Sequence, residues 1–342
     1  MNERTPQTPP IILPLTAAIS RPQWSVMIPA YNCSRYIKDT IESVLANDPG
    51  KELMQIEVID DDSTDADLEA LVKKIGKGRV SYFRQPRNVG SLRNFETCIN
   101  RATGKWVHIL HGDDKISEGF YREIESLFTT YPQAGAAFTA INYINENGEK
   151  LRVNDSVPIN CGIVENWLTQ IATGNLIQPP AIVVKREVYE KIGSFFAVHY
   201  GEDWEMWVRI AAGYPVAYSP KPLAMYRYLR TNSISSSSLR SGQNCKDIRK
   251  VINIINNYLP EQQRKKLARQ AKRKYSNYFA YCAKLIYEEY GDTKAALYQA
   301  RLAAAMDVNT ITVLALVKLY IKFILAAVGM KGALQRKYAR SV

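Results

Sequence analysis

Between residues 24 and 116 the sequence alternates short apolar runs with stretches of helical spacing, and this alternation constrains the fold more than any other feature. Runs typical of strands cover residues 25–28, 56–59, 80–83 and 106–110, and helical stretches lie near 34–45 and 92–102. Strands separated by helices pair in parallel, because each helix returns the chain to the same end of the sheet. We therefore expect an α/β domain built on a Rossmann-like sheet.

Acidic clusters directly follow two of these runs. Residues 60–62 and 65 are aspartates after the second run, and Asp113 and Asp114 follow the fourth. Ligands of such sheets bind at the carboxyl ends of the strands. The first cluster can cap the next helix or accept hydrogen bonds from a base or a ribose. The second crowds two carboxylates into one loop, where Mg²⁺ or Mn²⁺ would relieve their repulsion and bridge them to a diphosphate.

A third acidic cluster, at residues 201–205, stands beside aromatic residues at the start of an apolar helix. Apolar neighbours raise the basicity of a carboxylate toward the value that a general base needs. Acidic residues in the first turn also stabilise a helix through its dipole. Both interpretations of this cluster stay open at this point.

In this order and spacing, the segments resemble the family 2 glycosyltransferases of the GT-A fold. The resemblance covers roughly residues 23–235 and rests on residues 25–32, 58–65, 88–94, 112–114 and 201–209. It implies a mixed α/β GT-A domain over residues 23–239. It also implies an inverting transfer of a sugar from a nucleotide-diphosphate donor to a hydroxyl acceptor, in the synthesis of a polysaccharide or a glycolipid. Uridine is the most frequent base in the family, so UDP is the expected carrier.

The resemblance assigns roles to single residues. Asp203 matches the general base that deprotonates the acceptor. Asp113 and Asp114 match the end of the DxD-type motif that holds the ribose and the cofactor, Mn²⁺ or Mg²⁺. The other implied donor contacts are Pro29 and Tyr31 in the nucleobase pocket, Asp61 at the base edge, and Asn88, Arg93 and Asn94 on the nucleotide side.

Two positions depart from the family pattern. His111 stands where an acid often begins the metal motif, and it is either an extra ligand or a loop histidine that faces solvent. Leu229 stands where the segment after Tyr226 often ends in His. Arg227 or Arg230 can instead clamp the pyrophosphate in a bidentate way, although either can equally be a surface arginine.

The C-terminal third is basic. Residues 240–342 carry 20 Lys and Arg against 6 Asp and Glu, whereas residues 1–239 carry 25 against 27. We expect this region to be helical. Its apolar run 311–330 is long enough to cross a membrane, but Lys318 and Lys322 interrupt it on one helical face. The run suits a helix on an anionic membrane surface, or an amphipathic helix that packs on the fold.

Other segments and the cysteines set the remaining expectations. We expect residues 1–22 to form a flexible arm and the serine-rich stretch 232–238 to form a mobile loop. The five cysteines are odd in number and never spaced as CxxC, which favours a reducing cytosol. The protein is therefore expected in the cytoplasm, at the inner face of the membrane, with a glycan or lipid-linked acceptor.

Two rival classes of function remain at this point. A sugar-nucleotide binder without catalysis would explain His111 and Leu229. A nucleic-acid binder would use the basic region, where aromatic residues fall between 275 and 281. Those aromatics have the spacing of a helix core, so we expect no nucleic-acid partner.

Overall fold

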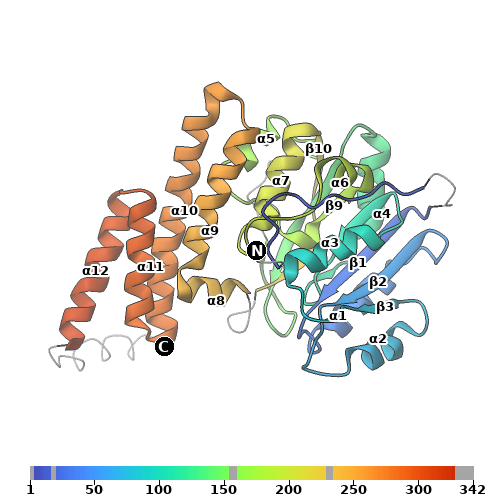
Figure 1. Cartoon of the computed structure of the whole chain (residues 1–342), viewed down its shortest axis with the longest axis horizontal. Helices are drawn as coiled ribbons and strands as arrows, with labels where there is room; N and C mark the ends of the chain where they lie inside the picture. Colours follow the sequence, from blue (N-terminus) through green and yellow to red (C-terminus); the bar gives the residue numbers. More distant parts are fainter. Residues whose placement is uncertain (1–3, 17–20, 154–159, 229–233, 328–342) are drawn as a thin grey trace. The chain divides into compact units, whose positions relative to one another are not determined.

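The computed structural model describes residues 4–16, 21–153, 160–228 and 234–327 (Figure 1). The chain forms two compact units, one of residues 1–229 with 257–259 and one of the remainder. The division after Leu229 falls earlier in the chain than the predicted boundary at residue 239.

The first unit is built on a mixed sheet, in which the described residues form ten strands. Along the main path the order is β3-β2-β1-β4-β9-β6-β10-β5, while β7 pairs with β6 and β8 with β10. Strands β3, β2, β1 and β4 are parallel, and β9 runs antiparallel to both β4 and β6. The bounds are β1 Trp24–Ala30, β2 Met54–Asp60, β3 Ser81–Arg84, β4 Trp106–Ile109, β5 Lys115–Ile116, β6 Ala136–Ile144, β7 Lys150–Val153, β8 Gly162–Ile163, β9 Ile182–Lys185 and β10 Val216–Arg227.

Helices connect the strands of this unit. They are α1 Ile37–Leu45, α2 Leu68–Gly76, α3 Ser91–Arg101, α4 Phe120–Thr130, α5 Trp167–Ile171, α6 Arg186–Ile192 and α7 Glu202–Gly213, with a 3₁₀ turn η1 at Pro179–Ala181. All seven residues of β1 are buried, because β1 lies between β2 and β4 and both sheet faces are covered. The predicted α/β fold is therefore confirmed, and the carboxyl ends of β1, β2 and β4 meet at one edge.

The N-terminal segment 4–16 lies against this unit, in contrast to the loose arm that the sequence suggests. The backbone N–H of Ala197 donates to the carbonyl of Pro6 at 2.8 Å, and that of Ser194 donates to the carbonyl of Pro10 at 2.9 Å. Ile12 is only 1% exposed. Backbone carbonyls and the buried side chains of Pro6 and Ile12 thus help to hold a segment that has no helical or strand periodicity.

The second unit is helical, as predicted. Its helices are α8 Ile234–Ser241, α9 Gln243–Ile255, α10 Glu261–Tyr290, α11 Thr293–Met306 and α12 Thr310–Ala327, and a 3₁₀ turn η2 Asn256–Tyr258 precedes α10. Residues 234–238 of the predicted loop are the beginning of α8, and the part before them lies outside the described residues. Serine residues are therefore accommodated in a helix here.

Helix α12 packs on α10 and α11 along one side only. Leu319 joins a buried cluster with Ile286 and Leu297, and Lys322 lies 3.8 Å from Glu288 of α10. The opposite side exposes several apolar side chains: Val313, Leu314, Val317, Ile321 and Ile324. Within the described ranges, which end at residue 327, no helix has both the length and the apolar character needed to cross a membrane.

Candidate active site

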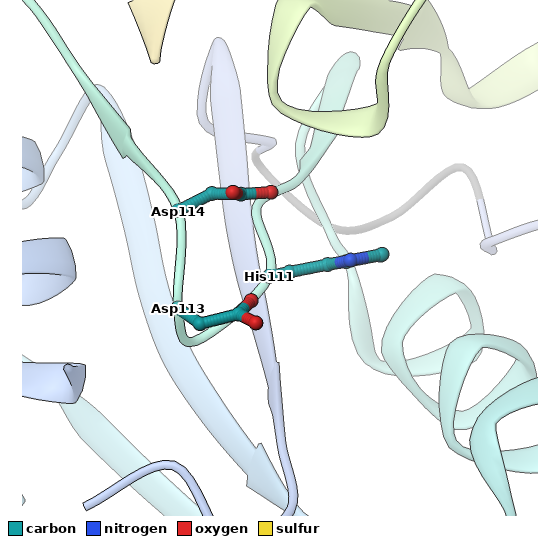
Figure 2. A group of neighbouring side chains, drawn as sticks. All are labelled: His111, Asp113 and Asp114. Carbon is teal, nitrogen blue, oxygen red and sulfur yellow. The ribbon is translucent and has the colours of Figure 1, made fainter. Parts of the chain in front are cut away.

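The loop after β4 carries a group of three potential metal ligands. The N–H of Gly112 donates to the carbonyl of Pro29 at 3.0 Å, so the loop continues beside the end of β1. A Cβ atom at Gly112 would lie 2.7 Å from Sγ of Cys33, which explains why glycine occupies this position. The ligand atoms of His111, Asp113 and Asp114 lie within 4.8 Å of one another, and Figure 2 shows that the three side chains point to the same side of the loop.

The electrostatics of this group favour a bound cation. Asp114 is 1% exposed, and its Oδ2 has no hydrogen-bond partner among the described residues. Burial and the charge of Asp113 raise the pKa of Asp114 well above its ordinary value. Burial lowers the pKa of His111, which keeps the imidazole neutral and able to bind a metal. An orphaned buried carboxylate oxygen next to a second carboxylate fits a divalent cation.

Arg227 shapes this loop from β10. The backbone N–H of Arg227 donates to Oδ1 of Asp114 at 2.8 Å, and Nε of its guanidinium donates to the carbonyl of Asp113 at 2.7 Å. The rest of its guanidinium binds two further carbonyls and Oδ2 of Asp39, and the residue is 3% exposed. Arg227, the predicted phosphate clamp, therefore contacts the candidate metal loop (residues 111–114) directly. The alternative clamp, Arg230, and the departure at Leu229 lie outside the described residues.

Asp61 organises the loop that follows β3. Its carboxylate accepts hydrogen bonds from the N–H of Val89 at 2.7 Å, the N–H of Gly90 at 2.9 Å and Nδ2 of Asn88 at 3.0 Å. Burial raises the pKa of Asp61, and the two backbone hydrogen bonds oppose the rise. Asp61 and Asn88 thus lie together at the carboxyl end of β2, where the sequence predicts the nucleoside.

The other predicted donor contacts differ in their surroundings. Pro29 is buried at the end of β1, and Tyr31 just beyond it is 52% exposed. Nη1 of Arg93 lies 2.6 Å from Oε2 of Glu96 at the side of α3. Asn94 is 2% exposed, and its Nδ2 donates to the carbonyl of Ile59 at 2.9 Å. Asn94 therefore links α3 to the end of β2 inside the unit, and its role as a nucleotide contact stays a prediction.

Asp203 is the second residue of α7 and lines a pocket whose walls are mostly apolar. Its Oδ2 accepts from Nδ2 of Asn175 at 2.7 Å, and its Oδ1 accepts from the N–H of Trp204 at 2.7 Å. Burial raises the pKa of Asp203 to about 6, although both hydrogen bonds oppose the rise. The pocket lining also includes His111, so the base candidate and one residue of the candidate metal loop face the same space. The lining residues are Phe95, Ile109, His111, Pro179, Ile182, Tyr189, Phe195, Glu202, Asp203 and Trp207.

Glu205, in the same acidic cluster as Asp203, is structural. It is fully buried, lies 2.9 Å from Nη2 of Arg209 and accepts from the hydroxyl of Tyr258 at 2.7 Å. Asp203 and Glu205 therefore have different environments: Asp203 lines the pocket and accepts from an amide and a backbone N–H, whereas Glu205 is paired with Arg209.

Two residues near the site were not predicted from the sequence. Asn175 orients the carboxylate of Asp203 from an irregular segment, where no motif marks it. Tyr226 is the second residue. Burial, together with the charges of Asp114, Asp113 and Asp203, raises the pKa of its hydroxyl well above the ordinary value. Its place directly before Arg227 is the signal that could have drawn attention to it.

Comparisons with known proteins agree with this geometry. Residues 25–193 match the family model described as Glycosyl transferase family 2. An uncharacterised protein of Mycobacterium tuberculosis is 25% identical over 61% of this chain and 68% of its own length. An uncharacterised glycosyltransferase of Mycoplasma genitalium is 32% identical over 32% of this chain and 37% of its own length. The second match thus spans little more than a third of that relative.

Solved structures share the fold. TarS from S. aureus, in complex with UDP-GlcNAc, aligns with a TM-score of 0.63 and 15% identity over 85% of this chain and 89% of its own. The mannosyltransferase PcManGT from Pyrobaculum calidifontis, in complex with GDP-Man and Mn²⁺, aligns with a TM-score of 0.54 and 17% identity over 98% of this chain and 81% of its own. The mixed α/β core thus has the GT-A fold, and a helical region follows it.

Proposed function

Since residues 25–193 of this chain belong to glycosyltransferase family 2, we propose that it transfers a sugar from a nucleoside-diphosphate donor to a hydroxyl acceptor, with inversion at the anomeric carbon. The observation that carries this proposal is the pocket that Asp203, with its raised pKa, shares with His111, whose ligand atom lies within 4.8 Å of those of Asp113 and Asp114. A general base and an acidic metal loop around one space are the two parts that such a displacement needs.

The donor would lie along the edge formed by β2, β1 and β4. Asp113 and Asp114 would hold Mn²⁺ or Mg²⁺, with His111 as a third ligand. The metal would neutralise charge that develops on the leaving diphosphate. Asp61 would face the nucleoside at the other end. UDP remains our proposed carrier, and the complexes of TarS with UDP-GlcNAc and of PcManGT with GDP-Man and Mn²⁺ support a sugar nucleotide in general.

Asp203 would act on the acceptor. Its carboxylate takes the proton of the acceptor hydroxyl, the hydroxyl oxygen forms a bond to the anomeric carbon, and the bond from that carbon to the diphosphate oxygen breaks. Asn175 and the N–H of Trp204 fix the orientation of the carboxylate. A fixed carboxylate with a pKa of about 6 is suited to take up a proton near neutral pH.

The acceptor would be a growing polysaccharide or a glycolipid. A teichoic acid biosynthesis protein of Bacillus subtilis is 30% identical over 31% of this chain, although over only 12% of its own length. The exposed Lys318 and the exposed apolar side chains of α12 support peripheral contact with an anionic membrane. We therefore place the protein in the cytoplasm, at the inner face of the membrane.

Release of nucleoside diphosphate tests the proposal against a binder without catalysis. Purified protein is incubated with UDP-, GDP-, CDP-, ADP- and dTDP-sugars, with MnCl₂, MgCl₂ or EDTA, and the free diphosphate is measured. We expect slow release from one nucleotide class with a metal and little with EDTA, because water can replace the acceptor in such sites. If no donor is consumed under any condition, even with membrane extracts as acceptor, the chain is a binder and the enzymatic proposal is wrong.

A further inference from the structure

The N-terminal segment reaches the edge of the sheet where the nucleoside is expected. The guanidinium of Arg4 donates to Oδ1 of Asn88, a residue 84 positions away in the sequence. A Cβ atom at Gly90 would lie 3.1 Å from Nε of Arg4, so the arginine also covers the backbone of the loop after β3. A side chain from outside the sheet is thus part of this edge.

Arg4 lies at the end of the site that is remote from the metal loop. Asn88 donates to Asp61 at the end of β2, whereas Asp113 and Asp114 follow β4. Strand β1 separates β2 from β4, so the two ends are about 10 Å apart at the usual spacing of strands. A donor whose diphosphate lies at the metal loop therefore presents its base and ribose to Asp61, Asn88 and Arg4.

The hydrogen bonds among Asp61, Asn88 and Arg4 support direct contact between Arg4 and a nucleotide. The carboxylate of Asp61 accepts three N–H groups from residues 88–90. The amide of Asn88 is shared between Asp61 and Arg4. Arg4 is exposed, and a guanidinium has five N–H donors in a planar fork. Base carbonyls and ribose oxygens are acceptors that match it.

Contacts of the residues that directly follow Arg4 hold its segment in place. Oγ1 of Thr5 lies 2.8 Å from Nε2 of His199, whose Nδ1 lies 3.2 Å from the hydroxyl of Ser91 at the start of α3. The carbonyls of Pro6 and Pro10 accept hydrogen bonds from residues just before α7. Arg4 is therefore presented to the edge by a fixed backbone, which lowers the entropic cost of a contact with a ligand.

We propose that Arg4 is a donor-binding residue whose guanidinium contacts the base and ribose of the nucleotide. This inference rests on the proposed function, because it needs a nucleotide at the edge of β1, β2 and β4. It adds to the site a residue from the N-terminal segment.

Calorimetric titration of Arg4→Ala tests the proposal. The probes are the nucleoside diphosphate that binds wild-type protein most tightly, among UDP, GDP, CDP, ADP and dTDP with MnCl₂, and the matching monophosphate. We expect the Kd of both to rise by about tenfold, because one charged hydrogen bond is lost. Arg4→Lys should raise the Kd by less than Arg4→Ala does. The melting temperature of Arg4→Ala without nucleotide should equal that of wild type, because the side chain of Arg4 is exposed.

Arg122→Ala is the charge-matched control, since Arg122 is 80% exposed on α4 and pairs only loosely with Glu118 at 3.7 Å. Its Kd should equal that of wild type. An Arg4→Ala variant that binds both probes as tightly as wild type, or more tightly, would overturn the proposal. A loss confined to the diphosphate would overturn it as well, because the contact would then be to phosphate. Wild-type protein that binds none of the nucleotides would instead contradict the proposed function itself.

Discussion

Replacing Asp203 by Asn is expected to slow sugar transfer by about 10²–10⁴-fold, while the Kd of the donor changes by less than about twofold. Asn keeps the shape of the side chain and an oxygen that can accept from Asn175, but it cannot take the acceptor proton. Because Asp203 lies in the pocket and not at the nucleoside end, donor binding should be spared. Single-turnover transfer and calorimetric binding of the donor measure the two quantities separately.

The matched control is Asp67→Asn. Asp67 caps α2, where its side chain accepts from the N–H of Ala70 at 3.0 Å, and Asn is an equally good N-cap. This variant should transfer sugar at the wild-type rate. Normal turnover by Asp203→Asn would show that the base lies elsewhere.

The pH profile gives a second check on Asp203. Burial raises its pKa to about 6, and only the deprotonated carboxylate accepts a proton. The rate of wild-type transfer should therefore be maximal above pH 6 and fall tenfold per pH unit below it. A carboxylate with an ordinary pKa would keep its activity down to about pH 4. A profile without a limb near pH 6 would contradict the assignment of the base.

Replacing either carboxylate of the candidate metal loop should weaken metal-dependent binding of the donor by about 100-fold. The reason is that a bound cation contributes several kcal/mol to the binding free energy of a diphosphate. The informative variants are Asp113→Ala and Asp114→Asn. Asn at position 114 keeps an oxygen for the N–H of Arg227, so the loop retains its anchor while the orphaned buried oxygen is replaced. Binding of the nucleoside diphosphate is titrated with MnCl₂ and with EDTA.

His111→Ala distinguishes a third ligand from a loop histidine in the same titration. Imidazole prefers Mn²⁺ and later transition metals over Mg²⁺, so loss of a ligand should weaken binding with Mn²⁺ more than with Mg²⁺. Equal effects would make His111 part of the pocket wall, where its ring stacks on Phe95 at 5.2 Å. Unchanged metal dependence in Asp113→Ala and Asp114→Asn would move the metal site elsewhere.

Local patterns were sufficient to predict the fold and the acidic ends of its strands. The apolar runs at 25–28 and 106–110 became parallel neighbours in the sheet, because completely buried strands need apolar residues on both faces. The order of the acidic clusters led to the family, which the family model confirms. These features lie within short stretches of the chain, so they can be recognised in the sequence without the tertiary structure.

The roles of single polar residues were less predictable, because they depend on partners far along the chain. Asn94 reaches the carbonyl of Ile59 and is buried, although its neighbours in sequence suggest a ligand contact. Arg227 meets Asp114, a residue 113 positions earlier. The docked segment 4–16 is held largely by backbone carbonyls, which leave no pattern in the side chains. Such contacts appear only once the strands bring distant loops to one edge.

We propose that the edge formed by β1, β2 and β4 binds a nucleoside diphosphate together with a divalent metal. A thermal-shift panel tests it most directly, because a ligand that binds only the folded state raises its melting temperature. Wild-type protein is heated with UDP, GDP, CDP, ADP or dTDP, each with MnCl₂ and with EDTA. We expect one nucleotide to raise the melting temperature by several degrees with MnCl₂ and by much less with EDTA. Equal melting temperatures in all ten conditions would contradict it.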